Sequence, residues 1–154
     1  MDQRSPLTAE RVLNTYSEKQ LQMVFEQYGE VTNAKTLAKR VVEVRKGAAL
    51  KSIQEFKQAI AICVYGNPNK YLAQVFQALR IEVNQELVVL KEFLQSISSW
   101  LAPKGRLCII TFHSLEDRIV KTWIKQESFE EELILSIANR TEKKLKSISK
   151  KPIS

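Results

Sequence analysis

The chain has 154 residues, 44% of them hydrophobic, which is enough to bury a core of ordinary size. Lys and Arg number 24 against 17 Asp and Glu, and the net charge of +7 favours polyanionic partners, with plain solubility as the alternative. One histidine and two scattered cysteines exclude a zinc cluster, and the lack of any apolar run near ~18 residues excludes a membrane span.

The cysteines and the amino terminus indicate the compartment. Cys63 and Cys108 form no C-x-x-C pair and lie in apolar surroundings, so we expect them to be reduced core residues. The chain does not open with a charged segment followed by an apolar one, so no signal peptide is expected. These features predict a soluble, cytoplasmic protein with no membrane partner.

Capping-box patterns predict helices within residues 1–70. Ser17-Glu-Lys-Gln20 precedes apolar residues at helical spacing, and Gly29 is placed to end that helix. Ser52-Ile-Gln-Glu55 opens a later helix, and Gly66-Asn-Pro68 marks the break after it. The buried face of the later helix is expected to hold Ile53, Phe56, Ile60 and Cys63.

Asn33 is expected to cap a helix between these two, which ends near Gly47. Basic residues gather along and just after it: Lys35, Lys39, Arg40, Arg45, Lys46 and Lys51. Such a cluster suits contact with an RNA backbone, although a solvated helix face explains it equally well. Short helices also permit a helix-turn-helix protein, but no recognition helix is evident, so DNA is not an expected partner.

One long helix is predicted over residues 70–98. Its apolar residues recur every three or four positions: Leu72, Phe76, Leu79, Val83, Leu87, Leu90, Leu94 and Ile97. Gln77, Arg80 and Asn84 form a separate polar face of that helix. This face is either solvated or a contact surface.

A buried strand is predicted over residues 107–112. The run is apolar, rich in β-formers, and follows the turn signal Pro103-Lys104-Gly105. Runs that are apolar on both faces are typical of covered parallel sheets. Ser114-Leu-Glu-Asp117 then has the spacing of a capping box, so a helix should run over residues 115–125.

His113, Ser114, Asp117 and Arg118 would therefore lie where a strand ends and a helix begins. Open α/β sheets bind ligands at such positions. A Ser-His-Asp triad is unattractive, because adjacent residues at a strand end point to different sides. The plain alternatives are capping for Ser114 and Asp117, strand-end hydrogen bonding for His113 and ion pairing for Arg118.

Two long motifs resemble signatures of one family, the MraW/RsmH methyltransferases. They are Phe112-His-Ser-Leu-Glu-Asp-Arg-Ile-Val-Lys121, preceded by Leu101-Ala-Pro-Lys-Gly-Arg106, and Phe76-Gln-Ala-Leu-Arg-Ile-Glu-Val-Asn-Gln-Glu-Leu87. Weaker blocks agree at residues 7–15, 28–30 and 150–153. The resemblance implies an enzyme that uses S-adenosylmethionine to methylate N4 of a cytidine in small-subunit ribosomal RNA.

The fold implied by the resemblance is α/β. An inserted all-helical domain would cover residues 1–70, and residues 71–154 would form the later part of a Rossmann-like methyltransferase sheet, with further strand candidates at 132–137 and 145–153. The sheet would be incomplete, because the family's amino-terminal cofactor half and final basic segment have no counterpart here. The chain's 4 glycines are far apart and form no G-x-G loop, so no cofactor-binding residue is expected within it.

The resemblance also implies site residues. His113 and Ser114 would border the methyl-transfer pocket, and Arg118 would hold a phosphate. RNA contacts are implied for Arg80 and Asn84, and the basic cluster adds Lys39, Arg40 and Arg45 as candidate RNA contacts. The partner would be small-subunit ribosomal RNA or the ribosomal subunit, with a dimer allowed, and the isolated chain is expected to be inactive or incomplete. The alternative is a noncatalytic basic helical module that binds RNA or the small subunit.

Overall fold

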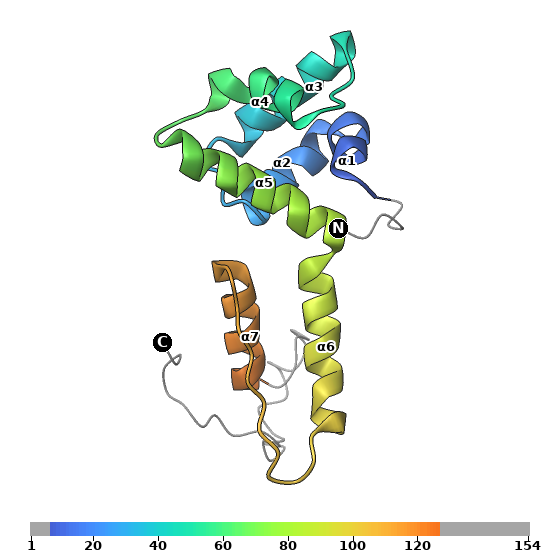
Figure 1. The fold of residues 1–154 in the computed structure, drawn as a ribbon, viewed down its shortest axis with the longest axis vertical. Coiled ribbons are helices and arrows are strands. Elements are labelled where there is room, and N and C mark those ends of the chain that lie inside the picture. The colour runs from blue at the N-terminus through green and yellow to red at the C-terminus, as the bar shows by residue number, and fades with distance from the viewer. Residues whose placement is uncertain (1–6, 127–154) are drawn as a thin grey trace, which may run out of the picture. The chain divides into compact units, whose positions relative to one another are not determined.

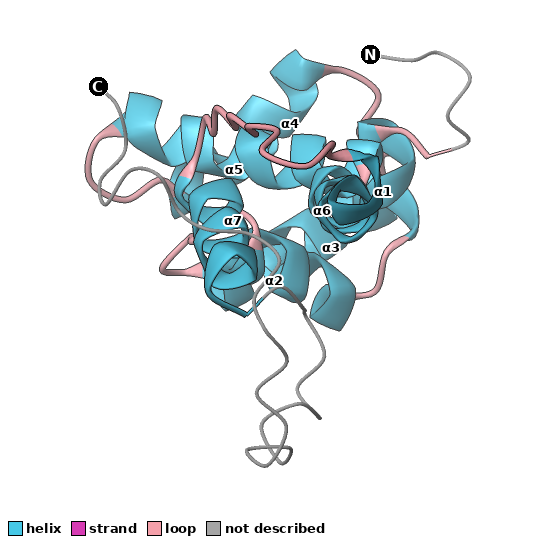
Figure 2. Ribbon diagram, turned by 90° about the horizontal axis from the view of Figure 1, so that it is seen from below, coloured by secondary structure: helices cyan, strands magenta, loops and turns pink. Residues whose placement is uncertain are grey.

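The computed structural model describes residues 7–126, within two compact units, Met1–Glu86 and Leu87–Ser154. All regular elements of residues 7–126 are helices, and no strand occurs among them (Figures 1 and 2). In the same range, no helix combines the length and the apolar character needed to cross a membrane. The strand candidates at 132–137 and 145–153 lie outside the described residues.

The first unit is a helical bundle. Its elements are α1 (Ala9–Thr15), α2 (Glu18–Gln27), α3 (Ala34–Gly47), α4 (Ile53–Ile60), the 3₁₀ turn η1 (Ala61–Cys63) and α5 (Pro68–Asn84) (Figure 1). The three helices predicted before residue 68 correspond to α2, α3 and α4, so their existence is confirmed.

Both predicted capping boxes are confirmed. The Ser17 hydroxyl accepts from the Gln20 N–H at 3.3 Å, and the Gln20 side chain accepts from the Ser17 N–H at 2.9 Å. Ser52 and Glu55 exchange the same pair of bonds at the start of α4. Reciprocal bonds of this kind satisfy donors that the first helical turn leaves unpaired, which is why the pattern locates the helix start.

Asn33 occupies the N-cap position of α3, as predicted, but it does not use its side chain there. Its side chain makes no capping bond to α3. Instead its Nδ2 donates to the carbonyl of Cys63 at 2.7 Å, and its Oδ1 accepts from the Tyr71 hydroxyl at 2.9 Å. Asn33 therefore ties α3 to η1 and α5. A side chain with both a donor and an acceptor can bridge distant segments, and local sequence does not reveal that choice.

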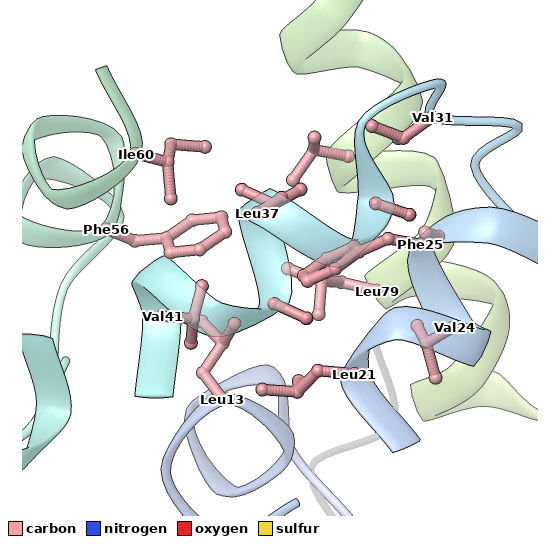
Figure 3. Packing of buried hydrophobic residues seen from close by; sticks show 14 of the residues in the cluster. Leu13, Leu21, Val24, Phe25, Val31, Leu37, Val41, Phe56, Ile60 and Leu79 are labelled. Atoms are coloured by element: carbon pink, nitrogen blue, oxygen red, sulfur yellow. The ribbon is translucent and has the colours of Figure 1, made fainter. Parts of the chain in front are cut away.

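The core of the first unit surrounds α3, which contributes the fully buried Leu37 and Val41 (Figure 3). Phe56 of α4 packs edge-to-face on Phe76 of α5, with ring centroids 5.9 Å apart. Ile53 was predicted to share the buried face of α4, but its side chain is 68% exposed. The buried face begins one turn later, at Phe56, so this part of the prediction is wrong.

The single long helix predicted over residues 70–98 is also wrong, because the chain breaks at Gln85. Gln85 adopts the left-handed conformation (φ 52°) between α5 and α6 (Glu86–Trp100). Tyr71 and Val75 of α5 belong to the core of the first unit, whereas Leu94 belongs to a separate cluster. The apolar residues that share one helical spacing over residues 70–98 therefore belong to two different cores. The compact units divide after Glu86. Helix α5 packs with the amino-terminal helices, whereas the predicted domain boundary at residue 70 lies near its start.

The second unit contains α6 and α7 (Ser114–Gln126), which confirms the predicted helix over 115–125. Between them, the Gly105 N–H donates to the Ala102 carbonyl at 2.8 Å and Lys104 has φ 65°, which confirms the predicted turn. Leu94 and Trp123 are buried in the core of this unit.

Residues 107–112 run alongside this core as extended chain, and the predicted strand is absent from the structure. Leu107 and Ile109 pack against the core, but Ile110 is 77% and Phe112 86% exposed. Cys108 is exposed on the same side, so its predicted core position is wrong. Side-chain exposure therefore alternates along residues 107–112, as in an extended segment that is covered on one face. The sequence prediction was a strand covered on both faces.

Candidate functional site

The amino terminus of α7 is organised by His113 and Glu116. The imidazole Nδ1 of His113 accepts from the Glu116 backbone N–H at 3.3 Å, while the Glu116 carboxylate accepts from the Phe112 N–H at 2.7 Å. The helical bond from the Asp117 N–H to the His113 carbonyl, at 3.2 Å, makes His113 the capping residue. The capping box predicted at Ser114 and Asp117 is therefore displaced by one residue.

This geometry assigns the histidine's protons. An Nδ1 that accepts a hydrogen bond carries no hydrogen, so a neutral His113 is protonated at Nε2. That Nε2 lies 3.5 Å from a carboxylate oxygen of Glu116. Glu116 was not among the residues predicted for this site, although the spacing H-x-x-E, with a carboxylate at the third helical position, was a signal for it.

The other predicted residues of this site lie on the first turns of α7. Ser114 is exposed at the first helical position, where its hydroxyl is not used as a cap. The Asp117 carboxylate forms an ion pair with Lys121 at 2.6 Å, across one helical turn. Arg118 is exposed one residue further along. The structure thus keeps all of these residues at one helix start.

Arg80 and Asn84, predicted to contact RNA, converge on Glu86. Arg80 binds both carboxylate oxygens, at 2.9 and 3.1 Å, and the Asn84 amide donates to one of them at 2.9 Å. Gln77 of the same polar face donates to the Tyr28 carbonyl at 3.2 Å. Arg80 and Asn84 thus hold the break between α5 and α6, and Gln77 ties α5 to the residue that follows α2.

The predicted basic cluster divides into structural and exposed members. Arg40 donates from Nε to the Ala59 carbonyl at 3.0 Å, and Arg45 donates from Nη1 to the Leu13 carbonyl at 2.8 Å. The lysines of the cluster are exposed: Lys35, Lys39, Lys46 and Lys51. Guanidinium groups suit part-buried carbonyls because they offer several donors in a fixed plane, whereas flexible lysines remain at the surface.

Two titratable groups of the first unit, the half-buried Tyr16 and the buried Cys63, are structural. Burial, together with a 2.6 Å hydrogen bond to Glu82, raises the pKa of Tyr16 to about 12, so the hydroxyl stays protonated and links α1 to α5. Burial also raises the pKa of the Cys63 thiol, which disfavours the reactive thiolate.

Comparison with known proteins gives the family. The sequence pattern of the MraW methylase family matches residues 1–154. The chain belongs to this family. Three relatives are named ribosomal RNA small subunit methyltransferase H: those of Flavobacterium johnsoniae (47% identical over 133 residues), Amoebophilus asiaticus (48% over 134) and Flavobacterium psychrophilum (40% over 151).

The MraW relatives are longer than this chain. The matches cover 86%, 86% and 97% of the chain, but only 44%, 43% and 52% of the respective relatives. The chain therefore spans about half the length of these relatives. The two long motifs at residues 76–87 and 101–121, on which the family resemblance rests, lie at the end of α5 and around the start of α7.

Proposed function

We propose that the chain is part of an S-adenosylmethionine-dependent methyltransferase that modifies N4 of a cytidine in small-subunit ribosomal RNA. The observation that carries the proposal is the 40–48% identity to relatives named ribosomal RNA small subunit methyltransferase H. In this proposal the first unit contacts RNA in the cytoplasm, and the second contributes one border of the catalytic pocket.

The proposal includes a Rossmann-like sheet that residues 107–112 join as a strand. Support comes from their extended conformation and from the exposed Ile110 and Phe112, whose burial a further layer would make favourable. The start of α7 would then follow the carboxyl end of a strand, the usual ligand-binding position of such sheets.

The residues of this chain do not fit the cofactor. Its 4 glycines stand far apart in sequence, and Gly29 has backbone oxygens of Gln74 and Phe25 at 2.8 and 2.9 Å from where a Cβ would lie, so it supports packing. We therefore place the cofactor-binding loop in the half of the relatives that the chain does not span, and derive no chemical step through the cofactor.

We expect no saturable micromolar binding when S-adenosylmethionine is titrated calorimetrically into the isolated chain. A chain joined to the remaining half of the Flavobacterium johnsoniae relative is expected to bind the cofactor and methylate small subunits. Micromolar binding to the isolated chain would show that we have misplaced the cofactor site.

The chain's own residues would hold the cytosine. The N4 amine is a weak nucleophile because its lone pair is delocalised into the ring, so the pocket must orient the base and accept from its N–H groups. The exposed Ser114 hydroxyl is suited to accept. The Nδ1 lone pair of His113 is already used by the Glu116 N–H, so we assign His113 to positioning this turn.

Exposed lysines of α3 would bind the RNA backbone. Lys39 and Lys46 are seven positions apart and so share a helix face. Changing both to Glu is expected to weaken binding to small-subunit RNA fragments and to lower the slope of log affinity against log salt by about 0.7–0.9 per lost phosphate contact. Filter binding at several salt concentrations measures both quantities.

The matched control changes Lys19 and Lys104, which are exposed and outside the basic cluster, to Glu. This control changes the net charge by the same amount as the Lys39 and Lys46 variant, and it should keep the salt slope of the wild-type chain. Arg40 and Arg45 are unsuitable for this test, because each holds a backbone carbonyl and its loss would disturb the fold. Equal effects of the two double variants would mean that the cluster is only a solvated face.

The alternative function is a noncatalytic basic helical module that binds RNA or the small subunit. The first unit has its own core and exposed lysines, which favours this reading. If the joined enzyme transfers no methyl group while the isolated chain binds RNA, the alternative is supported.

A further inference from the structure

The loop between η1 and α5 displays an aromatic side chain to solvent. Tyr65 is 82% exposed, whereas the other described aromatic residues of the first unit are buried or half-buried. A large apolar ring left in water forgoes the gain of burial, so it is available to stack against a partner.

Hydrogen bonds hold this loop at both ends. Before Tyr65, the Cys63 carbonyl accepts from Asn33 Nδ2 at 2.7 Å, and the Val64 N–H donates to the Ala61 carbonyl at 3.3 Å. After it, Asn67 Oδ1 accepts from the N–H groups of Asn69 and Lys70 at 3.0 and 3.2 Å. Tyr65 is therefore presented on an ordered loop, which lowers the entropy cost of binding through it.

Exposed lysines lie on the segments that are tied to this loop. Asn33 joins the start of α3 to both η1 and Tyr71 of α5, so the exposed Lys35 and Lys70 belong to the same joined set of segments as Tyr65. Residues 31–42 and 56–81 contain no Asp or Glu, and the acids that bound these ranges are Glu30, Glu43, Glu55 and Glu82. The charge complements a polyanion.

We propose that Tyr65 is a stacking platform for an unpaired RNA base, with Lys35 and Lys70 neutralising the phosphates beside that base. The proposal rests on the proposed function in ribosomal RNA methylation and adds a specificity for single-stranded RNA. Sequence-tolerant recognition of unpaired nucleotides commonly combines an aromatic ring with flanking positive charge. A duplex offers no free base face to the ring.

The test uses the full 154-residue chain and a fluorescein-labelled 12-nucleotide single-stranded RNA, with a duplex of the same length for comparison. Tyr65→Ala is expected to weaken single-strand binding by about fivefold or more, as expected for the loss of one stacked base. The salt slope and duplex binding should be unchanged. Tyr65→Phe keeps the ring and should bind like the wild type, and ultraviolet irradiation should crosslink the RNA to the peptide containing Tyr65.

The outcomes separate this inference from the proposed function. If the wild-type chain binds single-stranded RNA and Tyr65→Ala binds it equally well, the stacking site is wrong while the RNA-binding function stands. If the wild-type chain binds neither RNA, the stacking site and the proposed RNA contact of the first unit are both overturned. If Tyr65→Ala instead changes the sedimentation of the RNA-free chain, Tyr65 is a contact between copies and the inference also fails. Because the side chain is exposed, the melting temperature of Tyr65→Ala should match that of the wild type.

Discussion

Replacing Gly29 by Ala is expected to lower the free energy of unfolding by about 1–3 kcal/mol. An added Cβ would lie 2.8 Å from the Gln74 carbonyl of α5, 2.9 Å from the Phe25 carbonyl and 3.0 Å from Val31. Two of these neighbours are backbone atoms, so α2 or α5 must shift. Urea unfolding followed by circular dichroism measures the effect, and an unchanged m value would confirm that only stability has changed.

Gly47→Ala is the matched control. Gly47 is the last residue of α3, and nothing lies within 4 Å of where its Cβ would be. Alanine there should leave stability unchanged or raise it by up to ~1 kcal/mol, since glycine costs more conformational entropy on folding. Equal stability of the two variants would contradict the close approach of α5 to Gly29.

The second large effect is expected at His113. In the chain joined to the other half of a relative, His113→Ala should lower kcat roughly tenfold or more, a barrier increase of about 1.4 kcal/mol. Loss of the bond from the Glu116 N–H to Nδ1 should also lower stability by about 0.5–2 kcal/mol. Methyl transfer per folded molecule and thermal melting are the two measurements.

His113→Asn separates positioning from direct contact. Asparagine is a favoured capping residue and can accept the Glu116 N–H in place of the imidazole, so the variant should recover most of the stability and the turnover. If it melts like the wild type but remains tenfold slower, the imidazole itself touches the base and our assignment to positioning is wrong. Ser114→Ala, which removes a hydroxyl that caps nothing, should slow turnover without changing melting.

Helix starts were predictable here because their signals are local. The boxes at Ser17 and Ser52 use atoms within one helical turn, so spacing alone was sufficient. The start of α7 was predicted for the same reason, although its register was off by one residue. A histidine cap was not considered, since Ser and Asp rank higher at that position.

The break at Gln85 shows where local reasoning failed. The apolar spacing continues through it, so periodicity favours one helix, yet the residues on either side belong to different cores. Arg80 and Asn84 both bind Glu86 just beyond the break. Such bonds offset the conformational strain of a non-glycine residue in the left-handed conformation. They form only once the chain has turned, so the local sequence does not reveal them.

By itself, the sequence determined the helical character of the first unit, the turn at residues 102–105, the helix after His113 and the family, because each depends on neighbours in the chain or on motifs. Only the tertiary structure decided which polar residues serve the fold. Asn33, Arg40 and Arg45 bind carbonyls 19 to 32 residues away, and those partners are brought near only when the helices pack. The same packing left Tyr65 exposed, because burial depends on the neighbours that the fold supplies and not on the residue's own hydrophobicity.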